Sequence, residues 1–357
     1  VSIAYGMIAV AFAAWAWEGG IHVGLHRKVI VETKGKNIYT KPDPDYIEDL
    51  AAEGIDINEF QAILPLPFYT VGSDKFVPKW TYPDAALHTY KLSLDSGLSL
   101  IAGWLTRTSL SHSAKLTQLI SGPYVEKEIF EDLPSDKPLL IFKINDRPLI
   151  YPEQVLLREG ELVLNKHGFS LYRLRLDSLR LKRDRVERRF AQLPDETKFS
   201  NDHLIVTRDS AQIYFETYDQ NPVSPFGAET SVQKTPDRFV VYDGPINHEG
   251  RTEFTAWLKI DGAYPGLPIL KYEEYRPDGS LVTTYQDGVM FSTVVWRDWI
   301  RPYYLFQVEN PGNRVVIYFD ECQSEVESVL IRPENVDVFL SKEGEGLRMF
   351  NNYYFEE

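Results

Sequence analysis

Hydrophobic and polar positions follow two different periods along the chain, and the change falls near residue 199. Before it, apolar runs such as FQAILPLPFY (60–69) and KPLLIFKI (137–144) alternate with segments of helical period, which predicts alternating strands and helices. After it, short segments of apolar–polar alternation recur between turn sequences such as RPDGS, QDG and NPGN, which predicts antiparallel strands joined by hairpins. The pattern predicts an α/β domain followed by an all-β domain.

The first part contains recognisable helix and strand boundaries. The segments 42–54, 85–97 and 111–122 have helical period, and the third offers Ser111 or Ser113 as its N-cap and Gly122 as its stop. Residues 160–174 predict a closing hairpin that turns near NKHG, and RKVIVET (27–33) predicts another strand. We expect a three-layer α/β domain over 21–175 and a charged helical connector over 176–198.

The stretch WRDWIRPYYLFQV (296–308) is the densest aromatic segment of the predicted β-sandwich or jelly roll over 199–357. Because side chains alternate along a strand, one face should carry an almost wholly apolar set, namely Ile300, Pro302, Tyr304, Phe306 and Val308. The other face mixes rings with polar groups, namely Trp299, Arg301, Tyr303, Leu305 and Gln307. We expect the first face to be core and the second to be available to a ligand.

The first 17 residues carry no charge, and this length fits the latter part of a transmembrane helix over 1–20. Trp15 and Trp17 lie where an interfacial aromatic belt is expected. A signal-peptide core and a buried helix are the alternatives. Basic residues over 27–41 favour a cytoplasmic tail, but large domains cross membranes regardless of flanking charge, so charge alone leaves the orientation open.

The net charge limits the possible partners, and the cysteine content bears on the cellular compartment. The net charge is −14, and the basic run 173–189 is interrupted by three acidic residues. We therefore expect no nucleic-acid partner, because phosphate binding needs a continuous positive surface. The single cysteine, Cys322, rules out an intramolecular disulfide, which suits both the cytoplasm and a cystine-free periplasmic protein.

Several segments of the all-β part resemble a known family. These are EFTAWLKIDG, GLPILKYEEYRPDGSLV, WIRPYYLFQVENPGNRVVIYF and SVLIRP, whose order resembles the jelly-roll carbohydrate-binding modules of the family 4/9 type. The resemblance covers about residues 199–357 and is one of pattern, which jelly rolls without sugar ligands share. It implies a carbohydrate-binding-like module.

The whole arrangement, with the segment FQAILPLPFYTVGSDKF in its α/β part, resembles the C-terminal soluble part of multi-span bacterial membrane proteins related to the GT-C glycosyltransferases. Those proteins use lipid-linked sugar donors, and their soluble parts lie outside the cytoplasm. The resemblance implies a periplasmic location and supplies no catalytic residues, since the acidic catalytic loop of such enzymes lies near an early span.

Sugar binding requires a flat aromatic face and planar polar side chains. The candidates for a glycan surface are Trp296, Arg297, Trp299, Arg301 and Tyr303. Further rings and a polar partner nearby are Tyr272, Tyr275, Tyr285 and Glu273. Core packing is the alternative for any one of these rings, because large aromatic side chains are usually buried.

Metal, cofactor and catalytic signals are weaker. Candidate ligands for a structural calcium ion are Asp243, Glu249 and Asp261. The pair Asp43 and Asp45 fits a helix cap better than a metal site. His22 and His26 lack the glutamate of a zinc-protease motif, and the sequence contains neither a P-loop nor a G-x-G-x-x-G motif, so no nucleotide cofactor is indicated.

These observations favour a non-catalytic, extracytoplasmic region of a membrane protein involved in glycan or lipid-linked sugar transfer; the full-length protein would then be a glycosyltransferase. The first alternative is a protein-interaction or assembly module that binds no sugar. The second is a hydrolase in the α/β domain, for which the segment SLSHS with Ser109, Ser111 and His112 offers serine and histidine side chains.

Overall fold

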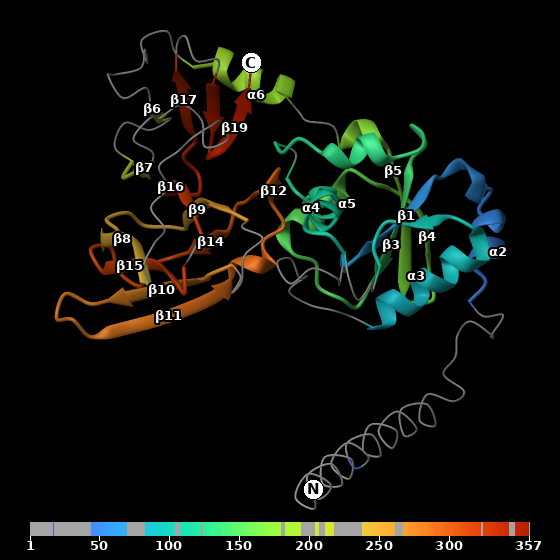
Figure 1. Cartoon of the computed structure of the whole chain (residues 1–357), viewed down its shortest axis with the longest axis horizontal. Helices are drawn as coiled ribbons and strands as arrows, with labels where there is room; N and C mark the ends of the chain where they lie inside the picture. Colours follow the sequence, from blue (N-terminus) through green and yellow to red (C-terminus); the bar gives the residue numbers. More distant parts are fainter. Residues whose placement is uncertain are drawn as a thin grey trace, which may run out of the picture.

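The structure is a computed structural model. The described residues are 17, 44–69, 83–103, 108–122, 124–179, 183–193, 204–206, 211–217, 238–260, 267–322, 324–342 and 347–356. Within these ranges the protein is mixed α/β and mostly β, and its strands form four sheets, which we number I to IV. Figure 1 shows the α/β part beside the β-rich part.

Sheet I belongs to the α/β domain and has the strand order β2-β1-β3-β5-β4. Strand β1 runs parallel to both β2 and β3, whereas β5 is antiparallel to β3 and β4. The strands are β1 (Ala62–Leu66), β2 (Ser99–Leu100), β3 (Leu139–Ile144), β4 (Glu161–Lys166) and β5 (Phe169–Leu174). The helices are α2 (Tyr46–Ala52), α3 (Pro83–Ser96), α4 (Leu110–Gln118) and α5 (Tyr151–Arg158).

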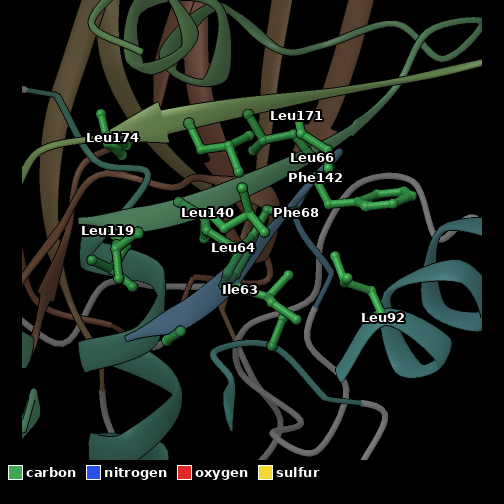
Figure 2. Packing of buried hydrophobic residues seen from close by; sticks show 14 of the residues in the cluster. Ile63, Leu64, Leu66, Phe68, Leu92, Leu119, Leu140, Phe142, Leu171 and Leu174 are labelled. Carbon is green, nitrogen blue, oxygen red and sulfur yellow. The ribbon is translucent and has the colours of Figure 1, made fainter. Parts of the chain in front are cut away.

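The core of this domain forms because β3 is apolar on both faces. Phe142 of β3 stacks on Phe169 of β5 at 5.0 Å between ring centroids, and both meet the ring of Tyr46 from α2. In Figure 2 the side chains of β1, β3 and β5 fill the space between Leu92 of α3 and Leu119 at the end of α4. The predicted buried strand is confirmed, and so is the closing hairpin of β4 and β5.

Helix boundaries agree with the sequence in part. Asp45 caps α2 by accepting the N–H groups of Ile47 and Glu48, as expected for a helix cap. Helix α4 begins earlier than predicted, because Ser109 has an extended backbone and its Oγ accepts the N–H of His112 at 3.2 Å. The predicted caps Ser111 and Ser113 therefore lie inside the helix.

Helix α5 was not predicted. Its first turn contains Pro152 and Glu153. The carboxylate of Glu153 accepts the N–H of Ile150 at 3.0 Å and the N–H of Phe68 at 2.7 Å, so it caps the helix and also fixes the segment that follows β1.

Sheets II and III pack face to face as a β-sandwich, as expected. Sheet II has the order β11-β10-β15-β8, with β8 (Arg238–Pro245), β10 (Ile269–Tyr275), β11 (Leu281–Gly288) and β15 (Arg314–Asp320). Sheet III has the order β12-β13-β9-β16-β7, and β14 pairs with β9. Its strands are β7 (Tyr214–Glu216), β9 (Thr252–Lys259), β12 (Val295–Trp296), β13 (Trp299–Ile300), β14 (Tyr303–Phe306) and β16 (Val326–Pro333).

The sandwich core receives side chains from both sheets, among them Phe254 and Leu258 of β9 and Ile317 and Phe319 of β15. The face of 300–308 that the alternation assigned to the core also lies there, through Ile300, Tyr304, Phe306 and Val308. This part of the prediction is confirmed.

Sheet IV is a difference from the single sandwich expected over 199–357. It contains β6 (Leu204–Val206), β17 (Val338–Lys342), β18 (Leu347–Phe350) and β19 (Tyr353–Glu356), in the order β19-β18-β17-β6. A separate apolar cluster explains it, because Phe339, Phe350 and Phe355 pack with Phe190 of α6 (Arg183–Ala191). Helix α6 lies within the segment 176–198 that we expected to be a charged helical connector, and it lies beside sheet IV in Figure 1.

Two predictions from the start of the chain lie outside the described residues. These are the transmembrane helix over 1–20, apart from Trp17, and the strand over 27–33. In the described part of the chain, no helix has the length and apolar character needed to cross a membrane.

Candidate functional site

The aromatic candidates of 296–303 lie where sheet III meets the α/β domain and sheet IV. Trp296 and Trp299 are 8% and 5% exposed. They form one cluster with Trp257 of β9 and with Val125 from the segment that follows α4. The structure thus brings the predicted rings together but covers them with other parts of the same chain.

The tip of the hairpin formed by β18 and β19 provides much of this cover. Its residues Asn351 and Asn352 have positive φ angles of 50° and 65°, which asparagine tolerates better than most residues. The indole Nε1 of Trp257 donates to the carbonyl of Asn352 at 2.7 Å, and Nδ2 of Asn352 donates to Oγ1 of Thr255 at 3.1 Å. The hairpin tip therefore occupies the surface that the alternation left available to a ligand.

The remaining candidates, Arg301, Tyr303 and Arg297, differ in how accessible they are. Arg301 is 2% exposed; its Nη2 donates to the carbonyl of Asn351 at 2.9 Å, and its guanidinium lies 4.1 Å from the ring centroid of Tyr353. Tyr303 is partly exposed, and Arg297 is exposed with its guanidinium 4.3 Å from the Trp296 ring. Only Arg297 and part of Tyr303 remain accessible among these candidates.

Lys127 lies at the same junction, in the segment that follows α4. Its buried Nζ donates to the carbonyls of Gln118 and Ser121 at 2.6 and 2.9 Å. The Ser121 hydroxyl in turn donates to the carbonyl of Thr293, and this bond joins the two domains. Burial lowers the pKa of Lys127 to about 7, because desolvation disfavours the ammonium.

The lowered pKa of Lys127 predicts a pH dependence of stability. Between about pH 7 and pH 10.5 the unfolded state still binds this proton, whereas the folded state has released it. The buried charge therefore lowers the free energy of unfolding most below pH 7, and this cost disappears as the pH rises toward 10.5. The free energy of unfolding of the wild type, minus that of Lys127→Met, should therefore increase over this pH range. The total increase should be about 1.4 kcal/mol for each unit by which the pKa of Lys127 differs between the folded and unfolded states. Urea unfolding at several pH values measures the difference, and parallel curves would contradict the assignment.

A second candidate surface lies on the outer side of sheet II, and we call it the polar face. Alternation along β10 and β15 turns their apolar residues toward the core and the intervening residues outward. With outward residues of β8, the polar face comprises Arg238, Asp243, Lys271, Glu273, Tyr275, Arg314, Tyr318 and Asp320. Several of its charged side chains are half exposed, including those of Arg238, Asp243 and Arg314.

Glu273 is the centre of the polar face. Its Oε2 accepts the hydroxyl of Tyr275 at 2.8 Å, and its Oε1 accepts the hydroxyl of Tyr318 at 2.8 Å. Arg238 lies 3.6 Å from Oε2 of Glu273, and its guanidinium covers the Tyr318 ring at 3.8 Å. One carboxylate thus orients two rings, and one of these rings is covered by a guanidinium.

Two ion pairs flank this centre. Arg314 makes a two-pronged pair with Asp243, with bonds of 2.6 and 2.5 Å, and Lys271 pairs with Asp320. With Arg238 and Glu273, the polar face carries three cations and three carboxylates, so its formal charge is zero. The surface offers both donors and acceptors without a strong net field.

The pKa shifts fix the protonation state of the polar face. Hydrogen bonds from Arg314 and Lys271 lower the pKa values of Asp243 and Asp320, respectively. Burial, with the hydrogen bond to Glu273, raises the pKa of Tyr318 to about 12, and the same carboxylate raises the pKa of Tyr275. At neutral pH Asp243 and Asp320 are therefore charged acceptors, and the hydroxyls of Tyr275 and Tyr318 are neutral.

The metal and catalytic candidates lie apart from both surfaces or take structural roles. Asp243 is paired with Arg314, Glu249 is exposed, and Asp261 lies outside the described residues, as do His22, His26 and Asp43. No group of three or more histidine, cysteine or acidic side chains in the described part of the chain could hold a metal ion. Of the proposed hydrolase residues, Ser109 is the cap of α4 and His112 is exposed.

The sequence analysis included Tyr275 and Glu273 as additional candidates for sugar binding but did not predict Arg238, Arg314 and Tyr318. The signal was present in RVVIYFD (314–320), where alternation places Arg314, Tyr318 and Asp320 on one face. The segment 296–303 was predicted as a site because its aromatic residues are close together in the sequence. The polar face, in contrast, is assembled from three strands that lie far apart in the sequence.

Comparisons with known proteins place the chain in no family. No family model matches it, and no curated protein matches it. Among solved structures it is similar to the enzymatically active domain of tailspike protein 4 of bacteriophage CBA120, with 14% identity and a TM-score of 0.22 over 39% of this chain. The match covers 19% of the phage chain, and a likeness at this level carries no argument about fold or function.

Proposed function

We propose that the β-sandwich is a glycan-binding module of the jelly-roll type and that its binding surface is the polar face of sheet II. The observation that carries the proposal is the Glu273 centre, in which one carboxylate holds the hydroxyls of Tyr275 and Tyr318 at 2.8 Å on an accessible side of the sandwich. A pyranose needs an aromatic face and paired donors and acceptors for adjacent hydroxyls. The partly exposed ring of Tyr275 supplies the face, and the charged side chains around Glu273 supply the polar groups, whereas the Tyr318 ring is only 6% exposed and lies under Arg238.

The strand pairing supports the jelly-roll part of the proposal. Strand β9 pairs with β16, and β10, the next strand along the chain, pairs with β15. These two pairs are nested in sequence, as in a hairpin wrapped into two sheets. The pattern agrees with the resemblance to carbohydrate-binding modules of the family 4/9 type.

The ligand class follows from the charges of the polar face. Each cation lies beside a carboxylate, as in Arg314 with Asp243 and Lys271 with Asp320, so an anionic polymer gains little from the surface as a whole. We therefore propose a neutral oligosaccharide as the ligand. The module would act in a non-catalytic, extracytoplasmic region of a membrane-anchored protein of glycan or lipid-linked sugar transfer, with segment 1–20 as its anchor.

Calorimetric titration of the chain with a panel of neutral and anionic oligosaccharides tests this proposal. We expect saturable binding of a neutral member, and we expect Tyr275→Ala to weaken it about tenfold or more, because stacking on one ring contributes on the order of 1–2 kcal/mol. Tyr275→Phe keeps the ring and loses the bond to Glu273, so it separates stacking from hydrogen bonding. A folded wild-type chain that binds no oligosaccharide at millimolar concentration would support the protein-interaction alternative instead.

A further inference from the structure

Strand β11 forms an open edge of sheet II. In the described part of the chain it pairs with β10 on one side, and no strand pairs with its other side. Figure 1 shows β11 along the outer margin of the β-rich part. The pairing with β10 is regular from Thr283 to Gly288, and several side chains of the strand are exposed, namely those of Leu281, Thr283, Thr284 and Gln286.

The hydrogen bonds to β10 show which backbone groups of β11 face outward. The N–H of Val289 donates to the carbonyl of Pro268 at 3.0 Å, just beyond the opposing pair of Ile269 and Gly288. In an antiparallel ladder this places Gly288 in a pair that exchanges no backbone bonds. Every second residue before it has the same orientation, so the N–H and C=O groups of Thr284 and Gln286 also point away from β10.

This edge lacks the features that keep other edges of the protein from pairing. Charged side chains, prolines and bulges protect an edge strand. Strand β8, at the opposite edge of sheet II, begins at Arg238 and ends at Pro245, and β4 of sheet I carries Lys166 and an irregular register. Strand β11 contains no proline, and its one charged residue is Asp287. Its outward backbone groups are therefore accessible to another strand.

We propose that β11 pairs with β11 of a second copy of this chain. The two strands run antiparallel about a twofold axis at Tyr285, so that the two sheets II form one continuous sheet. In this register Thr284 lies opposite Gln286 of the second copy, and the outward backbone groups of these two residues bond to each other. The twofold axis repeats each bond, as in the self-complementary interface of a symmetric dimer.

The side chains of β11 are complementary in this register. Asp287 lies opposite Thr283 of the second copy, whose hydroxyl can donate to the carboxylate. No two charged residues face each other, because Asp287 is the one charged residue of the strand. A register two residues further along would place Asp287 opposite its own copy, and like charges directly opposite are destabilising. Charge therefore favours the register centred on Tyr285.

The dimer would also affect the function proposed above. Both polar faces would lie on the same side of the continuous sheet, three strand spacings apart from β10 to β10, or about 14 Å. This consequence rests on the proposed glycan binding, since two nearby sites on one dimer bind a polymer with avidity. The interface itself needs no glycan, so its test is made without one.

The test measures the mass of the full chain by analytical ultracentrifugation from micromolar to near-millimolar concentrations. A nonionic detergent covers the uncharged residues 1–17. We expect a reversible monomer–dimer equilibrium for the wild type. Thr284→Pro removes an outward N–H, which an edge strand tolerates in the monomer, and it should raise the Kd of the dimer about tenfold or more. Val240→Lys, on β8 at the other edge, is the matched control and should dimerise like the wild type.

A pair of double variants tests the register and remains informative if Thr284→Pro does not fold. Thr284→Lys with Gln286→Lys places two lysines opposite each other across the interface and should abolish the dimer. Thr284→Lys with Gln286→Glu places each lysine opposite a glutamate and should keep it. Both positions are exposed, so both variants should fold, which circular dichroism checks. A wild type that is monomeric throughout, or two double variants with equal Kd, would overturn the proposal.

Discussion

Replacing Trp257 with alanine is expected to lower the free energy of unfolding by about 3–5 kcal/mol, the range for removing a buried aromatic ring. Trp257 is 1% exposed and packs with Trp296, Trp299 and Val125, so it contacts the sandwich, the α/β domain and the C-terminal hairpin together. Its loss would leave a cavity at the junction and would also leave the carbonyl of Asn352 without the indole N–H. Urea unfolding followed by far-ultraviolet circular dichroism measures the change.

Two variants give this measurement its controls. Trp257→Phe keeps most of the ring and loses the hydrogen bond, so it should cost clearly less than the alanine variant. Tyr275→Ala removes a partly exposed ring of the polar face and should also cost much less. Equal losses for Trp257→Ala and Tyr275→Ala would mean that Trp257 is not enclosed by the junction as described.

The Asn352→Ala variant is expected to lose about 2–4 kcal/mol of stability, which is the second largest effect. Asn352 is fully buried, and its side chain donates to Oγ1 of Thr255 and to the carbonyl of Ser328 while accepting the hydroxyl of Ser328. Each orphaned buried partner costs about 1–3 kcal/mol, and alanine also tolerates the positive φ poorly.

The backbone and side-chain parts of this loss can be separated. Asn352→Gly loses the same hydrogen bonds but accepts the φ angle, so it should be more stable than Asn352→Ala by roughly 0.5–1 kcal/mol. Asn247→Ala changes an exposed asparagine between β8 and β9 and should stay within about 0.5 kcal/mol of the wild type. A similarly small change for Asn352→Ala would show that the hairpin tip does not hold the face of sheet III.

Local pattern predicted the parts of the fold that depend on nearby residues. The continuous apolar run of β3 and the His167–Gly168 turn between β4 and β5 follow from composition and turn chemistry. The core face of 300–308 follows from alternation alone, because a strand has only two faces. Helix α5 was not predicted because its apolar stripe is short. Its capping residue, Glu153, also accepts a hydrogen bond from the N–H of Phe68, which lies far away in the sequence.

The candidate site could be predicted only in part, for a reason visible at Trp299 and Arg301. Alternation assigned both correctly to the face opposite the sandwich core, but it carries no information about what covers that face. The cover comes from Asn351 and Asn352, some 50 positions later, and from Val125, more than a hundred positions earlier. Such non-local packing leaves no periodic signal near 296–303, so an interior junction and a ligand surface have the same local sequence pattern.

We propose that glycan binds to the polar face of sheet II and not to the accessible edge of the 296–303 segment. The most direct measurement is the Kd of the best neutral oligosaccharide for the wild type, for Tyr275→Ala and for Arg297→Ala, whose side chain is exposed in that segment. We predict that Tyr275→Ala weakens binding at least tenfold and that Arg297→Ala binds like the wild type. Loss of binding in Arg297→Ala with wild-type affinity in Tyr275→Ala would contradict the account.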